Sequence, residues 1–319
     1  MKKDNIYLDG IVGLVVGDAL GVPVEFMSRQ KLKDNPVIGL VEGGAHEQPL
    51  GAWSDDSSMA LATLDGLLEG YNPDGIMQRF LKWFDENEYT SHGYVFDCGG
   101  TCGWAIEMYK IGRDCHKSGQ KDEYSNGNGS LMRILPMCLY CYDKKQIQGI
   151  SDQELIGMIH ETSALTHAHE RSLIGCGIYY FLVESIIEND GDLQTRLQKG
   201  INKAFEFYGN ELSEELSHYN RLKRLDVFMA LDEDEIDSTG YVVRTLEAAV
   251  WCLLNTTSFE EAVLKAVNLG DDTDTVGAVA GGLAGLFYGI DSIPNEWVDK
   301  IARIEWIKEL CERTERNYL

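Results

Sequence analysis

A short segment late in the chain places a dense acidic cluster directly before a run of small apolar residues. It reads NLGDDTDTVGAVAGGLAGLFYG over residues 268–289, with Asp271, Asp272 and Asp274 inside five positions. The apolar run is typical of a buried helix, and its glycines and alanines allow a neighbouring helix to approach closely. One aspartate is enough to cap a helix, whereas three neighbouring carboxylates repel one another unless a cation holds them. The segment therefore predicts a metal-binding helix start deep in the fold, with a surface cap as the alternative.

A second acidic cluster precedes another predicted helix, in GAWSDDSSMAL at residues 51–61. One aspartate there would serve as a cap, favoured by the helix dipole by roughly 0.3–1 kcal/mol, but two with a hydroxyl on each side exceed that need. Mg²⁺ and Mn²⁺ prefer carboxylate and hydroxyl oxygens, so two such clusters that meet would hold two metal ions about 3.5–4 Å apart. The candidate metal ligands are Ser54, Asp55, Asp56, Asp272, Asp274 and Thr275.

Helical periodicity extends along most of the chain, and strand-like alternation is scarce. There is no repeat at a fixed period and no linker rich in Pro, Gly or Ser. We therefore expect one all-α domain over residues 1–319, compact and orthogonally packed, with about a dozen helices around a central binuclear metal cleft. The predicted helices cover residues 6–20, 56–69, 73–86, 102–111, 130–142, 152–165, 171–188, 193–207, 214–228, 241–254, 258–269, 275–287 and 296–313.

The charge balance limits the partners of the chain. Its 28 Lys and Arg against 52 Asp and Glu give a formal net charge of −24, which argues against non-specific binding to nucleic acid or to an anionic membrane. No stretch is expected to reach the roughly 18 apolar residues of a membrane span, and the N-terminus lacks a signal-peptide core. We expect a cytoplasmic monomer whose eight cysteines are reduced, with a zinc site or disulfide at Cys138 and Cys141 as the less favoured alternative.

Three further segments carry candidate ligand-binding residues. The loop SNGNGSLMRILP, residues 125–136, leads into an apolar helix, so its backbone amides are suited to phosphate, although a simple turn is the alternative. His167 and His169 are either ligand contacts or turn residues, since zinc would need a third ligand nearby. Asp97 precedes glycines at a helix start, where a cap and a substrate ligand are both open.

Taken in order, these motifs resemble those of the ADP-ribosylglycohydrolase family. They are Gly-Asp-Ala-Leu-Gly-x-Pro-x-Glu, x-Trp-Ser-Asp-Asp-Ser, Asp-x-Gly-x-Thr, Asn-Gly-x-x-Met-Arg-x-x-Pro, Thr-His-x-His and Gly-Asp-Asp-Thr-Asp-Thr. The resemblance runs over residues 6 to about 300 and implies an all-α fold with two Mg²⁺ ions, or Mn²⁺, in a central cleft. It also implies a hydrolase that cleaves the glycosidic bond between ADP-ribose and a modified residue, and so an ADP-ribosylated protein or small conjugate as partner.

The resemblance implies roles for individual residues. The metal ligands fall on the six residues named above, and Glu25 matches a flap carboxylate. Asp55 or Asp56 would act as general base or acid, with Glu25 as the alternative. Arginine-linked ADP-ribose is the first choice of substrate, because Asp97 matches a carboxylate that faces the guanidinium. The segment that matches the phosphate and ribose contacts comprises Gly127, Asn128, Gly129, Ser130 and Met132, and of the two histidines His167 is nearer the matching position, with His169 as its rival.

Three other functions are alternatives to this one. Serine-linked ADP-ribose or another small ADP-ribosyl conjugate is an alternative substrate. A protein that binds ADP-ribose without cleaving it is an alternative of another class. The Asp-x-Asp-x-Thr/Val pattern at residues 272–276 also occurs in phosphatases that form an aspartyl-phosphate, but that chemistry needs the motif after a buried strand, and here it stands between predicted helices.

Overall fold

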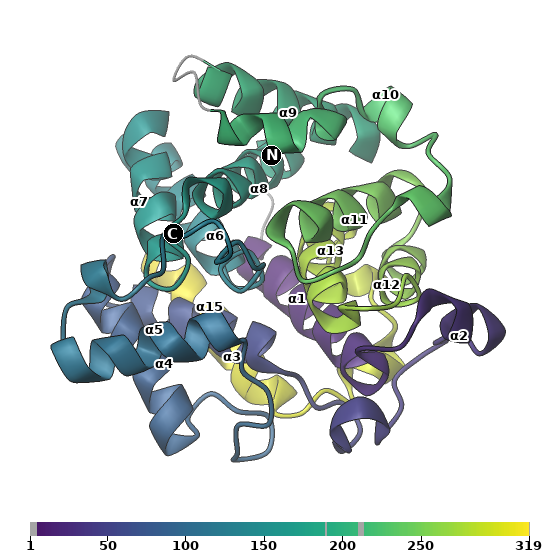
Figure 1. The fold of residues 1–319 in the computed structure, drawn as a ribbon, viewed down its shortest axis with the longest axis horizontal. Helices are drawn as coiled ribbons and strands as arrows, with labels where there is room; N and C mark the ends of the chain where they lie inside the picture. The colour runs from purple at the N-terminus through teal and green to yellow at the C-terminus, as the bar shows by residue number, and fades with distance from the viewer. Residues whose placement is uncertain (1–4, 189, 210–213, 319) are drawn as a thin grey trace.

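The computed structural model describes residues 5–188, 190–209 and 214–318, and this part of the chain is helical and contains no strand (Figure 1). The predicted all-α fold is confirmed. The α-helices are α1 (Ile6–Gly21), α2 (Arg29–Asp34), α3 (Asp55–Leu67), α4 (Pro73–Glu86), α5 (Gly100–Gly112), α6 (Leu135–Gln148), α7 (Asp152–Ala164), α8 (Glu170–Glu188), α9 (Leu193–Gly209), α10 (Leu225–Phe228), α11 (Val242–Leu254), α12 (Phe259–Val267), α13 (Thr273–Tyr288), α14 (Asn295–Val298) and α15 (Ile304–Tyr318).

One predicted helix begins later than expected. The prediction placed it at residues 130–142, whereas α6 starts at Leu135. Pro136 occupies the first turn of α6, where its missing N–H has no helical partner in any case. The residues before it form turns, which keeps the glycine-rich loop non-helical and free to line the site.

Two other predicted helices are interrupted. Residues 214–228 form a 3₁₀ helix (Glu215–Lys223) followed by the short α10, because Arg224 adopts a non-helical conformation between them. Residues 296–313 are divided between α14 and α15, and the left-handed φ of 58° at Arg303 separates the two. Periodicity of apolar residues continues across both breaks, so it did not reveal them.

The centre of the molecule is the contact between α1 and α13 (Figure 1). All residues of α1 except Leu8 are buried. A Cβ atom added to Gly17 would lie 2.0 Å from the carbonyl oxygen of Gly277, and one added to Gly281 would lie 2.3 Å from that of Gly13. The two helices are therefore in backbone contact, and only glycine fits where they meet.

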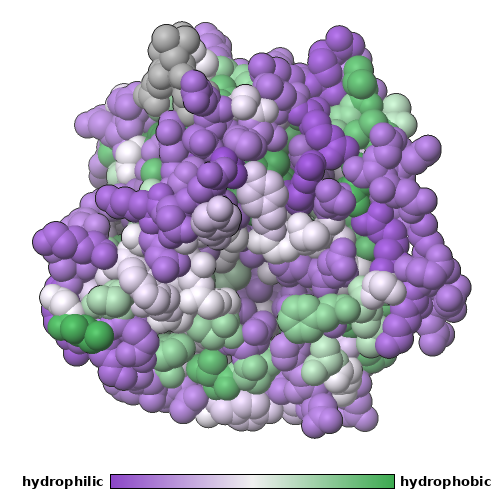
Figure 2. Space-filling model, in the orientation of Figure 1, coloured by the Kyte–Doolittle hydropathy of each residue, from purple (hydrophilic) through white to green (hydrophobic). Residues whose placement is uncertain are grey.

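The window Ile6–Val24 is long and apolar enough to span a membrane by length and composition, contrary to the sequence expectation. It is 94% buried inside the protein, which is the placement of a core helix. The outer face drawn in Figure 2 is mainly hydrophilic and is hollowed near its middle. All eight cysteines are free thiols and seven of them are buried, as the small-hydrophobe interpretation predicts.

We expect Gly17→Ala to lower the free energy of unfolding by about 1–3 kcal/mol or more, because the new methyl group meets backbone that cannot move aside cheaply. The matched control is Gly157→Ala in α7, where a Cβ meets nothing within 4 Å. That substitution should be neutral or stabilising by up to about 1 kcal/mol through helix propensity. Urea unfolding of both variants measures the difference, and equal effects would contradict the close-contact account.

Candidate active site

A buried aspartate on α1 holds the start of α3 in place. Asp18 is fully buried, and its carboxylate accepts the backbone N–H of Ser54 at 3.1 Å and that of Ser57 at 3.0 Å. It also accepts the Ser57 hydroxyl at 2.5 Å. Ser54 is the N-cap of α3, and its Oγ accepts the N–H of Asp56 at 3.3 Å. Asp18 stands in the quoted Gly-Asp-Ala-Leu-Gly motif, but sequence reasoning assigned it no role. It is one of two aspartates, with Asp9, in an otherwise apolar helix, and that was a usable signal.

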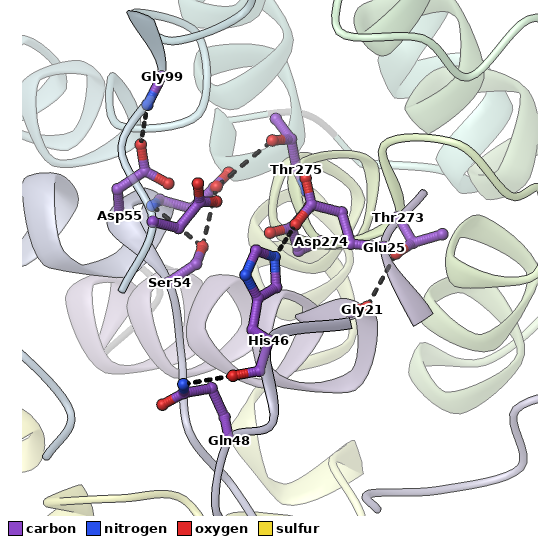
Figure 3. A network of polar contacts seen from close by, with 12 residues as sticks. Gly21, Glu25, His46, Gln48, Ser54, Asp55, Gly99, Thr273, Asp274 and Thr275 are labelled. Atoms are coloured by element: carbon purple, nitrogen blue, oxygen red, sulfur yellow. Dashed lines mark hydrogen bonds and ion pairs between the residues drawn. The ribbon is translucent and has the colours of Figure 1, made fainter. Parts of the chain in front are cut away.

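The start of α13 meets the start of α3. Asp272 is the N-cap of α13, and its Oδ2 accepts the side-chain amide of Asn128 at 2.8 Å. Thr275 Oγ1 lies 3.3 Å from Asp56 Oδ2 and so joins the two acidic clusters (Figure 3). Asp271, by contrast, is exposed, with a left-handed φ of 58°, and does not belong to the buried group.

The segment that carries Glu25 is fastened to the α12–α13 loop by backbone hydrogen bonds. Phe26 N–H donates to the Asp271 carbonyl at 2.7 Å, and Asp271 N–H donates to Met27 at 2.9 Å. Glu25 is thereby turned inward, and one carboxylate oxygen from each of Glu25, Asp272 and Asp274 lies within 4.8 Å of the others. The three carboxylates therefore form one cluster.

Glu25 also contacts a histidine that sequence reasoning missed. His46 Nε2 is hydrogen-bonded to Glu25 (Figure 3). These two residues form a second close group with Asp97. The His46 ring lies between the rings of Phe26 and Phe96, with centroids 5.9 and 5.4 Å away. His46 stands in a short 3₁₀ turn outside the quoted motifs, five residues before the one that begins at Gly51, and nothing in its local sequence indicates a role.

These groups open into a cavity of about 290 Å³. Among the residues that line it there is no lysine or arginine. Ser54, Ser130 and His169 do not line it: Ser130 is buried against Ser163 and Cys176, and His169 Nδ1 accepts the Arg171 N–H at the start of α8. The sequence-predicted residues that do line it are Glu25, Asp55, Asp56, Asp97, Gly127, Asn128, Gly129, Met132, His167, Asp272, Asp274 and Thr275.

The acidic wall of this cavity carries charge that the protein does not neutralise. Burial, with the neighbouring carboxylates adding to it, raises the pKa of Glu25 to about 9. Burial likewise raises the pKa of Asp18 to about 6, and that of Asp55, Asp56 and Asp274 well above the ordinary value for aspartate. Asp56 Oδ1 is buried without a hydrogen-bond partner. A set of carboxylate and hydroxyl oxygens with no cationic side chain fits hard divalent cations.

Another part of the cavity lining, beside Asp272, offers hydrogen-bond donors. The loop at residues 126–129 is held by Asn128 N–H donating to Gly240 at 2.9 Å, and by Val242 N–H donating to Asn126 at 3.0 Å. The N–H groups of Gly127 and Gly129 have no acceptor among the described residues. They are therefore available to an anionic group of a ligand.

We expect the stabilisation by Mg²⁺ to increase with pH. The folded pKa values of Asp18 and Glu25, about 6 and about 9, exceed the ordinary 3.8 and 4.5. From pH 3.8 to about 6 for Asp18, and from pH 4.5 to about 9 for Glu25, the metal-free folded protein holds more protons than the unfolded chain. The free energy of unfolding therefore falls as the pH rises through these ranges. A divalent cation takes the place of these protons. The Tm difference between Mg²⁺ and EDTA samples should grow by several degrees from about pH 5 to about pH 8, and a constant difference would contradict this.

Comparison with known proteins agrees with this arrangement. The family model for ADP-ribosylglycohydrolase matches residues 2–318. The chain is 32% identical to the ADP-ribosylarginine hydrolase Tri1 of Serratia proteamaculans over 95% of its own length and 77% of that protein, and 28% identical to the ADP-ribosyl-[dinitrogen reductase] glycohydrolase of Rhodospirillum rubrum over 92% and 89%. A solved structure described as an ADP-ribosylglycohydrolase-related protein complex superposes with a TM-score of 0.80 at 30% identity, covering 100% of this chain and 99% of that one. The chain therefore belongs to the ADP-ribosylglycohydrolase family.

Proposed function

We propose that this glycohydrolase cleaves the bond between ADP-ribose and an arginine side chain, and that it requires Mg²⁺, or Mn²⁺, to do so. The observation that carries the proposal is the meeting of the α3 and α13 starts at Asp56 and Thr275, beneath a cavity with donors in another part of its lining. Two relatives with 32% and 30% identity are named ADP-ribosylarginine hydrolases, which favours the arginine linkage.

In this proposal different parts of the substrate contact the acidic wall and the donor-bearing part of the cavity lining. The diphosphate lies against the free amides of Gly127 and Gly129, with His167 beside them. The ribose lies over the carboxylates. With a net charge of −24 and no basic side chain in the cavity, attraction of the anionic ligand depends on these local donors and on bound cations.

The residues that would hold the cations are Asp55, Asp56, Asp272, Asp274 and Thr275, which line the cavity, with Glu25 close enough to Asp272 and Asp274 to join them. Ser54, the sixth candidate, lies behind them and is hydrogen-bonded to Asp56. Bound Mg²⁺ supplies fixed positive charge for the ribose hydroxyl oxygens and lowers the pKa of a water molecule. The protein's part is to keep the two helix starts together, and the contacts of Asp18 and Asn128 do so on either side.

In the hydrolysis, the oxygen of a water molecule bonds to the anomeric carbon as the bond from that carbon to the arginine nitrogen breaks. One proton must leave the water and one must reach the leaving nitrogen. In this proposal Asp55 or Asp56 accepts the first, with Glu25 as the alternative. Glu25, held against His46 beside Asp97, is placed to hold a proton on the leaving-group side.

The acidity of the leaving-group side supports arginine over serine. Glu25 and Asp97 lie close together there, and the Phe26 and Phe96 rings flank His46 beside them. A guanidinium group is cationic and stacks on aromatic faces, so it suits this region. A serine oxygen leaving group is neutral and would offer no positive charge to the Asp97 carboxylate, whose Oδ1 accepts the Cys98 N–H at 2.8 Å.

Release of free ADP-ribose from arginine-linked and serine-linked substrates, each assayed with Mg²⁺ and with EDTA, tests the proposal. We expect Mg²⁺-dependent release from the arginine conjugate and at least tenfold less from the serine conjugate, a difference of about 1.4 kcal/mol. Preferred release from serine would establish the alternative substrate. ADP-ribose binding in calorimetry without release from either conjugate would establish the non-catalytic alternative.

Asp274→Asn should abolish both the Mg²⁺-dependent rise in Tm and turnover, with a loss of at least about a hundredfold in kcat, because it removes a buried charge from the proposed cation site. Asp271→Asn is the matched control, since Asp271 stands three positions earlier, is exposed and tolerates asparagine at its left-handed φ. It should leave both readouts near those of the unaltered protein. A fall in kcat with an unchanged Mg²⁺ response in Asp274→Asn would show a catalytic role without metal ligation.

A further inference from the structure

A buried arginine behind the cavity has no carboxylate partner. Arg133 is fully buried, its Nε and Nη1 atoms have no hydrogen-bond partner, and no described acidic side chain forms an ion pair with it. Its guanidinium lies over the Phe80 ring at 4.7 Å. Nη2 donates to the Thr162 carbonyl at 3.1 Å and to Thr166 Oγ1 at 2.8 Å. An unpaired buried cation is costly, which points to a use for it beyond packing.

The Thr166 hydroxyl connects this arginine to His167. Thr166 Oγ1 lies 2.9 Å from His167 Nδ1. Arginine can only donate, so the hydroxyl oxygen accepts from Arg133 and its own hydrogen is left for an acceptor. His167 Nδ1 is that acceptor. The Cys102 thiol also borders Thr166, but sulfur is a weak acceptor, and this thiol donates to the Gly129 carbonyl at 3.6 Å.

His167 is neutral, because burial and then the Arg133 charge lower its pKa to about 3. A neutral imidazole carries one hydrogen, and when Nδ1 accepts, that hydrogen is on Nε2. Nε2 faces the glycine loop that lines the cavity: it lies 3.5 Å from the position of a Cβ on Gly127 and 3.3 Å from that of one on Gly129. The Nε2–H group therefore stands beside the free amides of that loop.

Little else on this wall is able to donate from a side-chain nitrogen. The cavity lining holds no lysine or arginine, and the Asn128 amide already donates to Thr245 at 2.9 Å and to Asp272 at 2.8 Å. Beside the backbone amides of the glycine loop, the side-chain nitrogen that can donate to a ligand oxygen on this wall is that of His167, and it can do so in one tautomer only. The other tautomer would present a lone pair to that oxygen and repel it.

We propose that Arg133 and Thr166 are positioning residues that hold His167 as the Nε2–H tautomer, so that the ring donates to an oxygen of the substrate's diphosphate. The identity of that ligand group rests on the proposed function, whereas the tautomer does not. Arg133 and Thr166 touch neither the diphosphate nor the reacting atoms; they act through His167.

Nitrogen-15 NMR of protein labelled at histidine tests the tautomer directly, without any ligand. His167→Gln identifies the His167 signals by their absence. We expect Nε2–H in the unaltered protein, and a mixed or inverted tautomer in Thr166→Val, which keeps the side-chain volume and removes the hydroxyl. Thr166→Ser should restore Nε2–H. The matched control is Thr162→Val, which removes a buried hydroxyl that donates to the Met158 carbonyl at 2.8 Å and leaves the carbonyl contacted by Arg133 in place.

Calorimetry with ADP-ribose in Mg²⁺ tests the consequence. Thr166→Val should weaken binding by roughly tenfold, as expected for loss of one donor to a charged group, while Thr162→Val and Thr166→Ser should bind as the unaltered protein does. In turnover, Thr166→Val should raise KM more than it lowers kcat.

The NMR and calorimetry experiments together distinguish failure of the positioning role from failure of the proposed function. An Nδ1–H ring in the unaltered protein, or a tautomer unchanged by Thr166→Val, would overturn the positioning role whatever ADP-ribose does. Equal loss of affinity in Thr166→Val and Thr162→Val would also overturn it, because that result would reflect general damage to the end of α7 and the turn after it. A third outcome is that the unaltered protein shows the expected tautomer and Thr166→Val loses it, while ADP-ribose does not bind. That result would overturn the diphosphate assignment and the proposed function, but it would establish that Arg133 and Thr166 set the tautomer of His167.

Discussion

Backbone contact between α1 and α13 is the constraint on which the site depends. Gly13 and Gly17 on one helix face Gly281 and Gly277 on the other, and a single added methyl group would fall within 2.4 Å of a facing carbonyl oxygen. The contact continues to Gly21, whose Cβ position lies 2.3 Å from the Asp274 backbone. The run of small residues after the acidic cluster thus explains how that cluster reaches the interior. Larger residues would hold the helix starts apart and leave the carboxylates at the surface.

Bringing these carboxylates inward has an electrostatic cost that the rest of the site must offset. Part of it is met by donors: Asp18 receives the first N–H groups of α3, and Asp272 receives the Asn128 amide. The remainder is not met by protein, since Asp56 Oδ1 has no partner and no lysine or arginine lines the cavity. Protons or divalent cations must supply the missing positive charge. Folding of this region and metal binding are therefore linked.

The sequence predicted this site well where the chemistry is local and poorly where it depends on distant contacts. The paired acidic helix starts were visible because charge next to an apolar run is a local conflict. Asp18 stands in a quoted motif, but its bonds to the start of α3 appear only in the fold, and His46 likewise meets Glu25 only there. Arg133 appeared in a motif, but its role needs Thr166, which lies 33 positions away.

Some of the predicted helix boundaries were wrong for a related reason. Apolar periodicity marks which residues face the core, and it continues through a turn whose residues also face the core. The segment at 130–134 is buried like a helix, yet Pro136 and the contacts of Asn128 make it a loop. Arg303 similarly divides a periodic stretch through one left-handed residue.

The use of a neutral histidine and backbone amides for an anionic ligand follows from the carboxylates that line the same cavity. In a space of about 290 Å³, a lysine or arginine on the donor wall would reach the acidic wall and pair with it. Such a pair would remove the charge that attracts metal ions and would occupy the place of the substrate. A neutral N–H group does not cancel the charge of a carboxylate, as the bond from Asn128 to Asp272 shows, but it is sufficient to bind a phosphate oxygen at contact distance. The positive charge of Arg133 instead lies behind His167, with Thr166 between them. From there Arg133 orients the His167 ring through Thr166 without reaching the metal ligands.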